Sequence, residues 1–171
     1  MKKYIIIILI TILLISCSSS SNGLDVSNSP LTQSYNWQFK LNGVLYKWSG
    51  GLYDESGQNH YKVGSKKLNL VKGNLNLIIL FPSASTGNFT FNSSTPSEFS
   101  LYFYYTNMNI DVYDTNAGGT MNVNVSSISS NSYSSNSSNP GKVIGTFSGT
   151  LKKQGGQLST ITDGYFEVLN F

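Results

Sequence analysis

The 171-residue sequence contains no arginine, one cysteine (Cys17), one histidine (His60) and four prolines, and only 11% of its residues are charged. Arginine is the residue that most often binds phosphate and guanine through two parallel hydrogen bonds, so its absence argues against nucleic acid as a partner. A disulfide needs two cysteines, so the chain has to fold on its apolar core alone. A zinc site needs three or four ligands, and histidine and cysteine are too scarce to supply them.

Material for helices is also scarce. Segments rich in Leu, Glu, Lys and Ala at helical spacing are missing, and such segments usually build helices. Asn, Ser, Gly and Tyr are abundant instead, with 16 glycines and 11 tyrosines. This polar but weakly charged mixture favours an exported β-protein.

The first seventeen residues have the layout of a secretory signal peptide. Lys2 and Lys3 precede an apolar run at 4–15, and Ser16 and Cys17 follow. The run has roughly 12 residues, whereas a transmembrane helix needs about 20. The end of the run, Leu14-Ile15-Ser16-Cys17, resembles the lipobox of bacterial lipoproteins. That resemblance implies cleavage before Cys17 and lipidation of its thiol, palmitate included; the alternative is an ordinary cleaved signal in which Cys17 is incidental.

Three regions follow from this reading. Residues 1–16 form the signal peptide, and residues 17–34 form the lipidated cysteine with a flexible tether rich in Ser and Asn. Residues 35–171 form a single all-β domain, because about 155 mature residues fit one domain. Within it, a Ser/Asn-rich tract at 127–140 has no hydrophobic period and is predicted to be a long, mobile loop.

The best-defined predicted element is a hairpin at the start of the domain. Residues 36–41 and 44–48 alternate polar and apolar side chains, and Asn42-Gly43 between them is the strongest short hairpin signal. A two-residue turn fixes the register, which pairs Leu41 with Val44, Phe39 with Tyr46 and Trp37 with Trp48.

Short strands continue along the rest of the chain. They are predicted at 67–71, 75–81, 89–91, 99–106, 109–113, 120–126, 142–152 and 157–169. The run 75–81 is apolar on both faces, which indicates a central or covered strand. We therefore expect an antiparallel β-sandwich or a partly open β-barrel of about 8–10 strands.

The C-terminal quarter carries the sequences GTFSGTL at 145–151 and ITDGYF at 161–166. Together with the lipobox and the opening Asn-Gly hairpin, they resemble a family of uncharacterised lipoproteins from Bacteroidetes. The resemblance implies an all-β envelope protein on the outer membrane. It brings no activity and no catalytic residue.

Catalytic constellations are sparse. The sequence contains no Gly-x-Ser-x-Gly nucleophile motif for which His60 could act as the general base. We therefore expect His60 in a loop or at a strand edge. The acidic pairs are Asp54 with Glu55 and Asp163 with Glu167, and nothing singles out either pair as the two carboxyls of a glycosidase. The sequence therefore predicts a protein that is not an enzyme, with an envelope hydrolase as the third hypothesis.

A calcium site is the one cofactor that the sequence suggests. Asp114-x-Asn116-x-Gly118 copies part of a calcium loop, and Asp111 could add a further oxygen. No glutamate follows in register to complete the loop. The alternative is a polar turn between two strands, which Asn-Ala-Gly-Gly at 116–119 suits well.

Two tyrosines are the candidate ligand-binding residues. Tyr102 and Tyr104 share one face of a predicted strand, and exposed tyrosines with Asn neighbours suit sugar binding through ring stacking and amide hydrogen bonds. The alternative is that these rings belong to a second buried face or line a barrel.

The sequence thus predicts a lipid-anchored cell-envelope protein that serves as a non-catalytic binding or structural module. The alternative is a lipoprotein that binds a glycan or a small ligand. Expected partners are the membrane, through the lipid, and a glycan or an envelope protein. Residues 18–22 are free of acidic side chains, and Asp25 is the first one, which favours the periplasmic face of the outer membrane over the cell surface.

Overall fold

The computed structural model describes residues 35–50, 58–130, 132–134, 137–139 and 141–170. The predicted signal peptide, lipidation site and tether (1–34) lie outside these residues, as do Asp54 and Glu55. All regular elements in the described part are strands, and none of its residues belongs to a helix that could cross a membrane.

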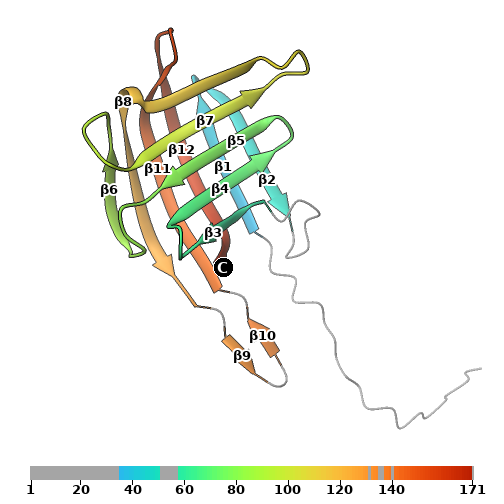
Figure 1. Ribbon diagram of the computed structural model, residues 1–171. Coiled ribbons are helices and arrows are strands. Elements are labelled where there is room, and N and C mark those ends of the chain that lie inside the picture. Colours follow the sequence, from blue (N-terminus) through green and yellow to red (C-terminus); the bar gives the residue numbers. More distant parts are fainter. Residues whose placement is uncertain (1–34, 51–57, 131, 135–136, 140, 171) are drawn as a thin grey trace, which may run out of the picture. The chain divides into compact units, whose positions relative to one another are not determined.

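The described residues form twelve strands (Figure 1). They are β1 (Tyr35–Leu41), β2 (Val44–Gly50), β3 (His60–Lys62), β4 (Lys67–Lys72), β5 (Leu75–Leu80), β6 (Gly87–Phe91), β7 (Glu98–Tyr104), β8 (Ile110–Ile128), β9 (Ser132–Ser134), β10 (Ser137–Asn139), β11 (Gly141–Lys153) and β12 (Leu158–Asn170).

Seven of these strands close into a barrel. Their order is β11-β8-β7-β5-β4-β3-β12, and β12 pairs with β11 to complete the ring. All neighbours are antiparallel except β3 and β12, which run parallel. The β1–β2 hairpin extends the sheet from β12, and β6 adds to β8. The predicted all-β class is confirmed, and of the two predicted architectures the barrel is the one formed, closed rather than partly open.

The barrel is flattened into two layers that cross each other (Figure 1). A six-stranded layer runs in the order β6, β8, β11, β12, β1, β2, and a four-stranded layer consists of β7, β5, β4 and β3. Strand β8 belongs to both, because its first residues pair with β7 and its second half pairs with β6. Strand β12 likewise reaches β3 through Leu169 and Asn170.

The predicted first hairpin is confirmed with its register. Leu41 pairs with Val44, and the two pairs farther from the turn are Phe39 with Tyr46 and Trp37 with Trp48. Asn42 and Gly43 both have positive φ, 49° and 83°, as the two-residue turn requires.

Strand β8 replaces two predicted strands and the polar turn between them. Its pairing with β11 jumps from Gly119–Leu151 to Asp114–Lys152, so residues 115–118 form a bulge instead of a turn. Gly119 has a φ of 99°, and a Cβ there would lie 2.4 Å from the Thr150 carbonyl oxygen. The bulge bends one continuous strand from the four-stranded layer into the six-stranded layer.

Two short elements differ from the sequence prediction. Strand β3 was not predicted, because only Tyr61 among its three residues is apolar and buried. The tract predicted as a loop at 127–140 begins inside β8 and contains the paired strands β9 and β10. Ser129 N–H donates to the Lys142 carbonyl at 2.8 Å, so the end of β8 and the start of β11 are held together and the chain between them returns as a hairpin.

Interleaved aromatic rings fill the space between the layers. Phe147 lies at the centre, with its ring centroid 5.5 Å from that of Phe99, 5.8 Å from that of Phe39 and 6.3 Å from that of Phe166. All four side chains are buried. The barrel interior is therefore occupied by side chains, and the outer faces are the surfaces left for function.

Candidate ligand-binding face

The outer surface of the six-stranded layer is built from alternating strands. On β8, Met121 and Val123 are buried in the core, whereas Thr120, Asn122 and Asn124 are exposed. Successive strand residues point to opposite faces, so every apolar residue turned inward places a polar neighbour outward. Strands β6 and β11 follow the same rule, and Asn88, Thr90, Thr146 and Ser148 on these strands present amides and hydroxyls outward.

Strand register aligns these side chains into a row across six strands, which we call the polar row. Each member is paired with the next across the strands. Its members are Asn88 (β6), Asn124 (β8), Thr146 (β11), Tyr165 (β12), Gln38 (β1) and Lys47 (β2). Paired strands lie about 4.8 Å apart, so the row extends over roughly 24 Å.

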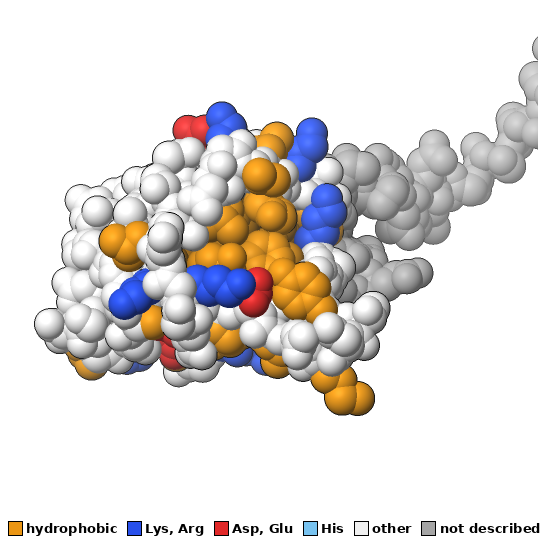
Figure 2. Space-filling view, turned by 90° about the horizontal axis from the view of Figure 1, so that it is seen from above, with side chains coloured by type: hydrophobic (Ala, Val, Ile, Leu, Met, Phe, Trp, Pro, Cys, Tyr) orange, Lys and Arg blue, Asp and Glu red, His pale blue; other side chains and the backbone are white. Residues whose placement is uncertain are grey.

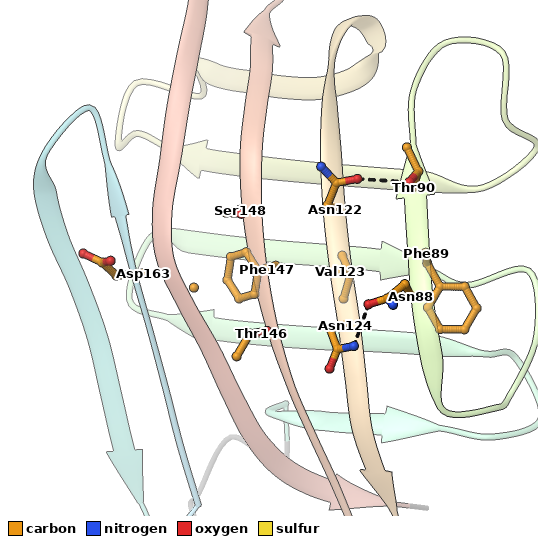
Figure 3. A pocket seen from close by; sticks show the side chains of 11 residues that line it. Asn88, Phe89, Thr90, Asn122, Val123, Asn124, Thr146, Phe147, Ser148 and Asp163 are labelled. Carbon is orange, nitrogen blue, oxygen red and sulfur yellow. Dashed lines mark hydrogen bonds between the residues drawn. The ribbon is translucent and has the colours of Figure 1, made fainter.

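A depression of about 530 Å³ lies over one half of this surface (Figure 3). Its polar lining comes from β6, β8, β11 and β12 and consists of Asn88, Thr90, Asn122, Asn124, Thr146, Ser148 and Asp163. Asp163 has a φ of 55° and stands at a bulge in β12, which shifts the register against both β11 and β1.

Hydrogen bonds fix the amides in this depression. Asn124 Nδ2 donates to Asn88 Oδ1 at 2.6 Å, and Thr90 Oγ1 donates to Asn122 Oδ1 at 3.0 Å. In Figure 3 the Nδ2 atom of Asn122 and the Oδ1 atom of Asn124 point away from these bonds. One donor and one acceptor are thus held in place on neighbouring positions of the same strand.

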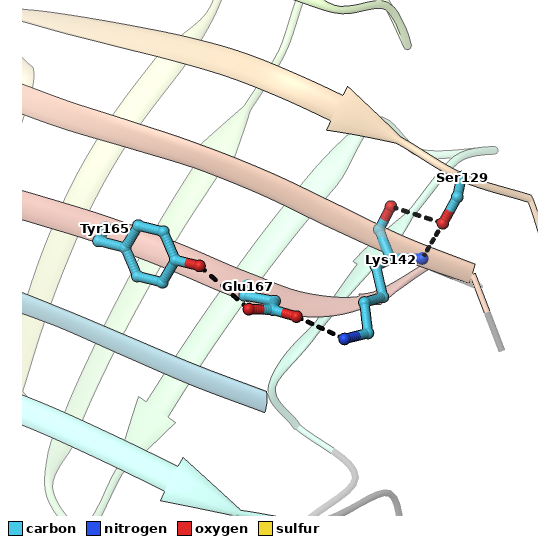
Figure 4. A network of polar contacts seen from close by, with 4 residues as sticks. All are labelled: Ser129, Lys142, Tyr165 and Glu167. Atoms are coloured by element: carbon cyan, nitrogen blue, oxygen red, sulfur yellow. Dashed lines mark hydrogen bonds and ion pairs between the residues drawn. The ribbon is translucent and has the colours of Figure 1, made fainter. Parts of the chain in front are cut away.

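The acidic groups on this face are held in ion pairs. Glu167 accepts a hydrogen bond from Lys142 Nζ at 2.5 Å and another from the Tyr165 hydroxyl at 3.0 Å (Figure 4). The lysine bond is the main cause that lowers the pKa of Glu167, and burial is the main cause that raises the pKa of Tyr165. Asp163 pairs with Lys40 at 2.8 Å. The face therefore presents little net charge, and the Tyr165 ring is fixed through its hydroxyl.

The Glu167 pair predicts a pH dependence of stability. Because the pKa of Glu167 is lower in the folded chain than in the unfolded chain, the pair stabilises the fold above the unfolded value of about 4.3. This stabilisation is lost as the pH falls through the lower, folded value. Glu167→Gln should therefore lower the free energy of unfolding by about 0.5–1 kcal/mol at pH 7, and it should change this free energy very little at pH 3.

Urea unfolding between pH 7 and pH 3 measures this difference. Asp163→Asn is the matched control, since its ion pair is more exposed and asparagine tolerates the positive φ at this position. A cost of Glu167→Gln that stays constant across the titration would contradict the assigned ion pair.

The predicted tyrosine pair lies on the other layer. The rings of Tyr102 and Tyr104 project from the outer face of β7, nearly parallel, with centroids 6.2 Å apart. Tyr104 is exposed, whereas Tyr102 is half-buried and donates to Glu98 Oε1 at 3.4 Å. The pKa of the Tyr102 hydroxyl is raised, and burial is the main cause. The two rings thus share one surface, but on the layer opposite the polar row.

The residues of the predicted calcium site have other partners. Asp111 Oδ2 accepts from Lys153 Nζ at 2.7 Å and from the Tyr105 hydroxyl at 3.1 Å, and the lysine bond is the main cause of its lowered pKa. Asp114 is buried and accepts the backbone N–H of Ala117, which fixes the bulge in β8, while Asn116 is exposed beside it. Within the described residues, no three His, Cys, Asp or Glu side chains gather around a common point.

The remaining catalytic candidates lie apart from one another. His60 is half-buried on β3, paired with Asn69 and Leu169 at the seam of the barrel. Asp163 and Glu167 both project from β12 but are held in separate ion pairs.

Sequence reasoning had not named the residues of the polar row as a site. The alternation in Thr120–Met121–Asn122–Val123–Asn124 predicts a strand but not a site. What assembles the site is the register between strands far apart in sequence. Comparison with protein-family models, with curated proteins and with solved structures finds no match for this chain.

Proposed function

We propose that this protein is a lipid-anchored, non-catalytic binding module of the cell envelope, and that it binds a neutral glycan on its polar row. The observation that carries the proposal is the aligned row of polar side chains on six adjacent strands, in which Asn88, Asn124 and Tyr165 are fixed by hydrogen bonds. The beginning of the chain supports the anchor, with Cys17 at the end of a lipobox-like segment.

The chemistry of the face fits an uncharged sugar polymer. Sugar hydroxyls both donate and accept hydrogen bonds, and side-chain amides and hydroxyls do the same. Tyr165 adds an aromatic ring of the kind on which sugar rings stack. A row of roughly 24 Å is long enough for several sugar units, so a chain rather than a single sugar would use the whole face.

The charge distribution of the face favours neutral ligands over strongly charged ones. Its carboxylates, Asp163 and Glu167, are neutralised by Lys40 and Lys142. A phosphate-rich or heavily sulfated ligand is usually held by several unpaired cations, and the centre of this face presents hydroxyls and amides instead.

Binding should therefore be insensitive to salt. We expect neutral polysaccharides to bind and acidic ones to bind more weakly in a screen of both classes with the mature protein. Affinity for the neutral ligand should be the same at low and at high ionic strength, because hydrogen bonds and stacking are screened little. Affinity that falls steeply with salt, or selective binding of acidic polymers, would overturn the proposal.

A further inference from the structure

We infer that the end of the barrel carrying the β1–β2, β7–β8 and β11–β12 turns rests on an anionic bilayer surface, the membrane to which the proposed lipid anchor attaches the chain. We call this end the hairpin end. The inference builds on the anchor part of the proposed function and adds an orientation to it.

Exposed apolar side chains concentrate at the hairpin end. Eight large hydrophobic residues are exposed in the described part of the chain, and seven of them lie in or beside these three turns. They are Val44, Leu45, Tyr104, Tyr105, Met108, Ile110 and Leu158. Figure 2 shows hydrophobic side chains across the middle of this end, with lysines beside them.

Hydrogen bonds hold the three turns together. The Asn42 N–H in the β1–β2 turn donates to the Thr160 carbonyl on β12 at 2.9 Å. Gln154 N–H in the β11–β12 turn donates to the Val112 carbonyl on β8, also at 2.9 Å. The apolar side chains therefore form one surface rather than three independent loops.

Met108 is the most exposed of these side chains. Its relative exposure is 94%, and its φ of 63° is a left-handed conformation that costs an L-residue free energy. Gly or Asn would fit this turn position without that cost. A strained backbone that displays a long apolar side chain at a hairpin tip suggests a functional role for the side chain.

The base of this tip is rigid. Lys153 Nζ contacts Asp111 and lies 6.0 Å from the centre of the Tyr113 ring, while the Tyr105 hydroxyl donates to the same aspartate. These contacts join the β7–β8 turn to β8 and β11 under the tip.

A bilayer fits this surface better than a protein partner does. The exposed apolar side chains are spread over three joined turns, and a fluid bilayer surface can accommodate all of them without a shaped complementary site. Lys152 lies near the end of β11, next to the β11–β12 turn, and Figure 2 shows lysines beside the apolar side chains. These cations favour anionic headgroups. Residues 18–34 can extend about 56 Å, whereas β1 rises only about 20 Å towards this end, so the tether is long enough.

A fluorescent label at the tip tests the orientation. In the mature chain carrying Met108→Cys, the Cys17 thiol is occupied by lipid, so an environment-sensitive dye attaches at position 108. We expect a doxyl-labelled lipid to quench this dye at least about twofold in phosphatidylethanolamine–phosphatidylglycerol vesicles. The matched control, Ser83→Cys in the exposed loop after β5, should stay unquenched. A second variant tests whether Met108 is kept for stability. Met108→Asn should raise the midpoint of unfolding, because asparagine tolerates the positive φ at this position. If the methionine side chain instead stabilises the fold, the same substitution should lower the midpoint.

Flotation with the vesicles separates the two proposals. If the unlabelled chain fails to float, or floats equally well with Cys17→Ser, the lipid anchor is wrong, and the orientation inferred from it is overturned as well. If the chain floats through Cys17 but neither dye is quenched, the anchor stands and the hairpin end serves a different partner, such as a protein. Equal quenching at both positions also overturns the orientation.

Discussion

Replacing Phe147 by alanine should lower the free energy of unfolding by about 3–5 kcal/mol, a large part of the 5–15 kcal/mol typical of a domain. The side chain is 3% exposed, and its ring packs against Phe39, Phe99 and Phe166 from three other strands. Removing it leaves a cavity that the surrounding rings cannot fill, because strand pairing fixes the backbone on both sides.

Urea unfolding followed by intrinsic fluorescence measures this loss. Tyr104→Ala is a suitable control, since Tyr104 is 44% exposed on the outer face of β7 and should cost less than about 1 kcal/mol. A Phe147→Ala variant that loses less than about 1 kcal/mol would show that the ring does not hold the two layers together.

Much of the fold follows from local patterns in the sequence. The Asn42-Gly43 turn fixes one register of the first hairpin, and the apolar alternation then places Phe39 and Tyr46 on the same face. The doubly apolar segment of β5 was predicted to be central, and β5 indeed lies between β4 and β7. These features depend on neighbouring residues, so the sequence shows them directly.

Barrel closure depends on interactions that no local pattern shows. The parallel contact of β3 with β12 joins His60 to Leu169, more than a hundred residues away. Asn59 supports this closure, because its Oδ1 accepts from the Trp37 indole at 2.9 Å and from the Val71 N–H at 2.6 Å. A single asparagine in a polar stretch gives no sign that it will be buried between three strands.

The candidate site also combines features that the sequence predicts with features that depend on strand register. The alternation on β8 could be predicted, and so could the exposure of Asn122 and Asn124. Their alignment with Thr146 and Tyr165 depends on the β8–β11–β12 register, which includes two bulges and a four-residue insertion. Tyr102 and Tyr104 lie on one strand, so the sequence alone shows that they share a face. The polar row crosses six strands, so only the register shows that its members lie side by side.

The largest functional effect is expected from removing two amides of the polar face. Asn122→Ala combined with Asn124→Ala deletes the outward-pointing donor and acceptor, and each lost hydrogen bond should weaken binding about tenfold. Both side chains are exposed on β8, so the fold should be preserved. The matched comparison is Tyr102→Ala combined with Tyr104→Ala, which alters the outer face of the opposite layer.

The decisive measurement is the titration of a neutral polysaccharide, chosen from the screen, into the mature protein and these two double variants. If the polar row is the binding face, the asparagine variant loses about 100-fold in affinity and the tyrosine variant stays within about threefold of the unaltered protein. Loss of binding in the tyrosine variant, with full affinity in the asparagine variant, would contradict the account and place the ligand on the four-stranded layer.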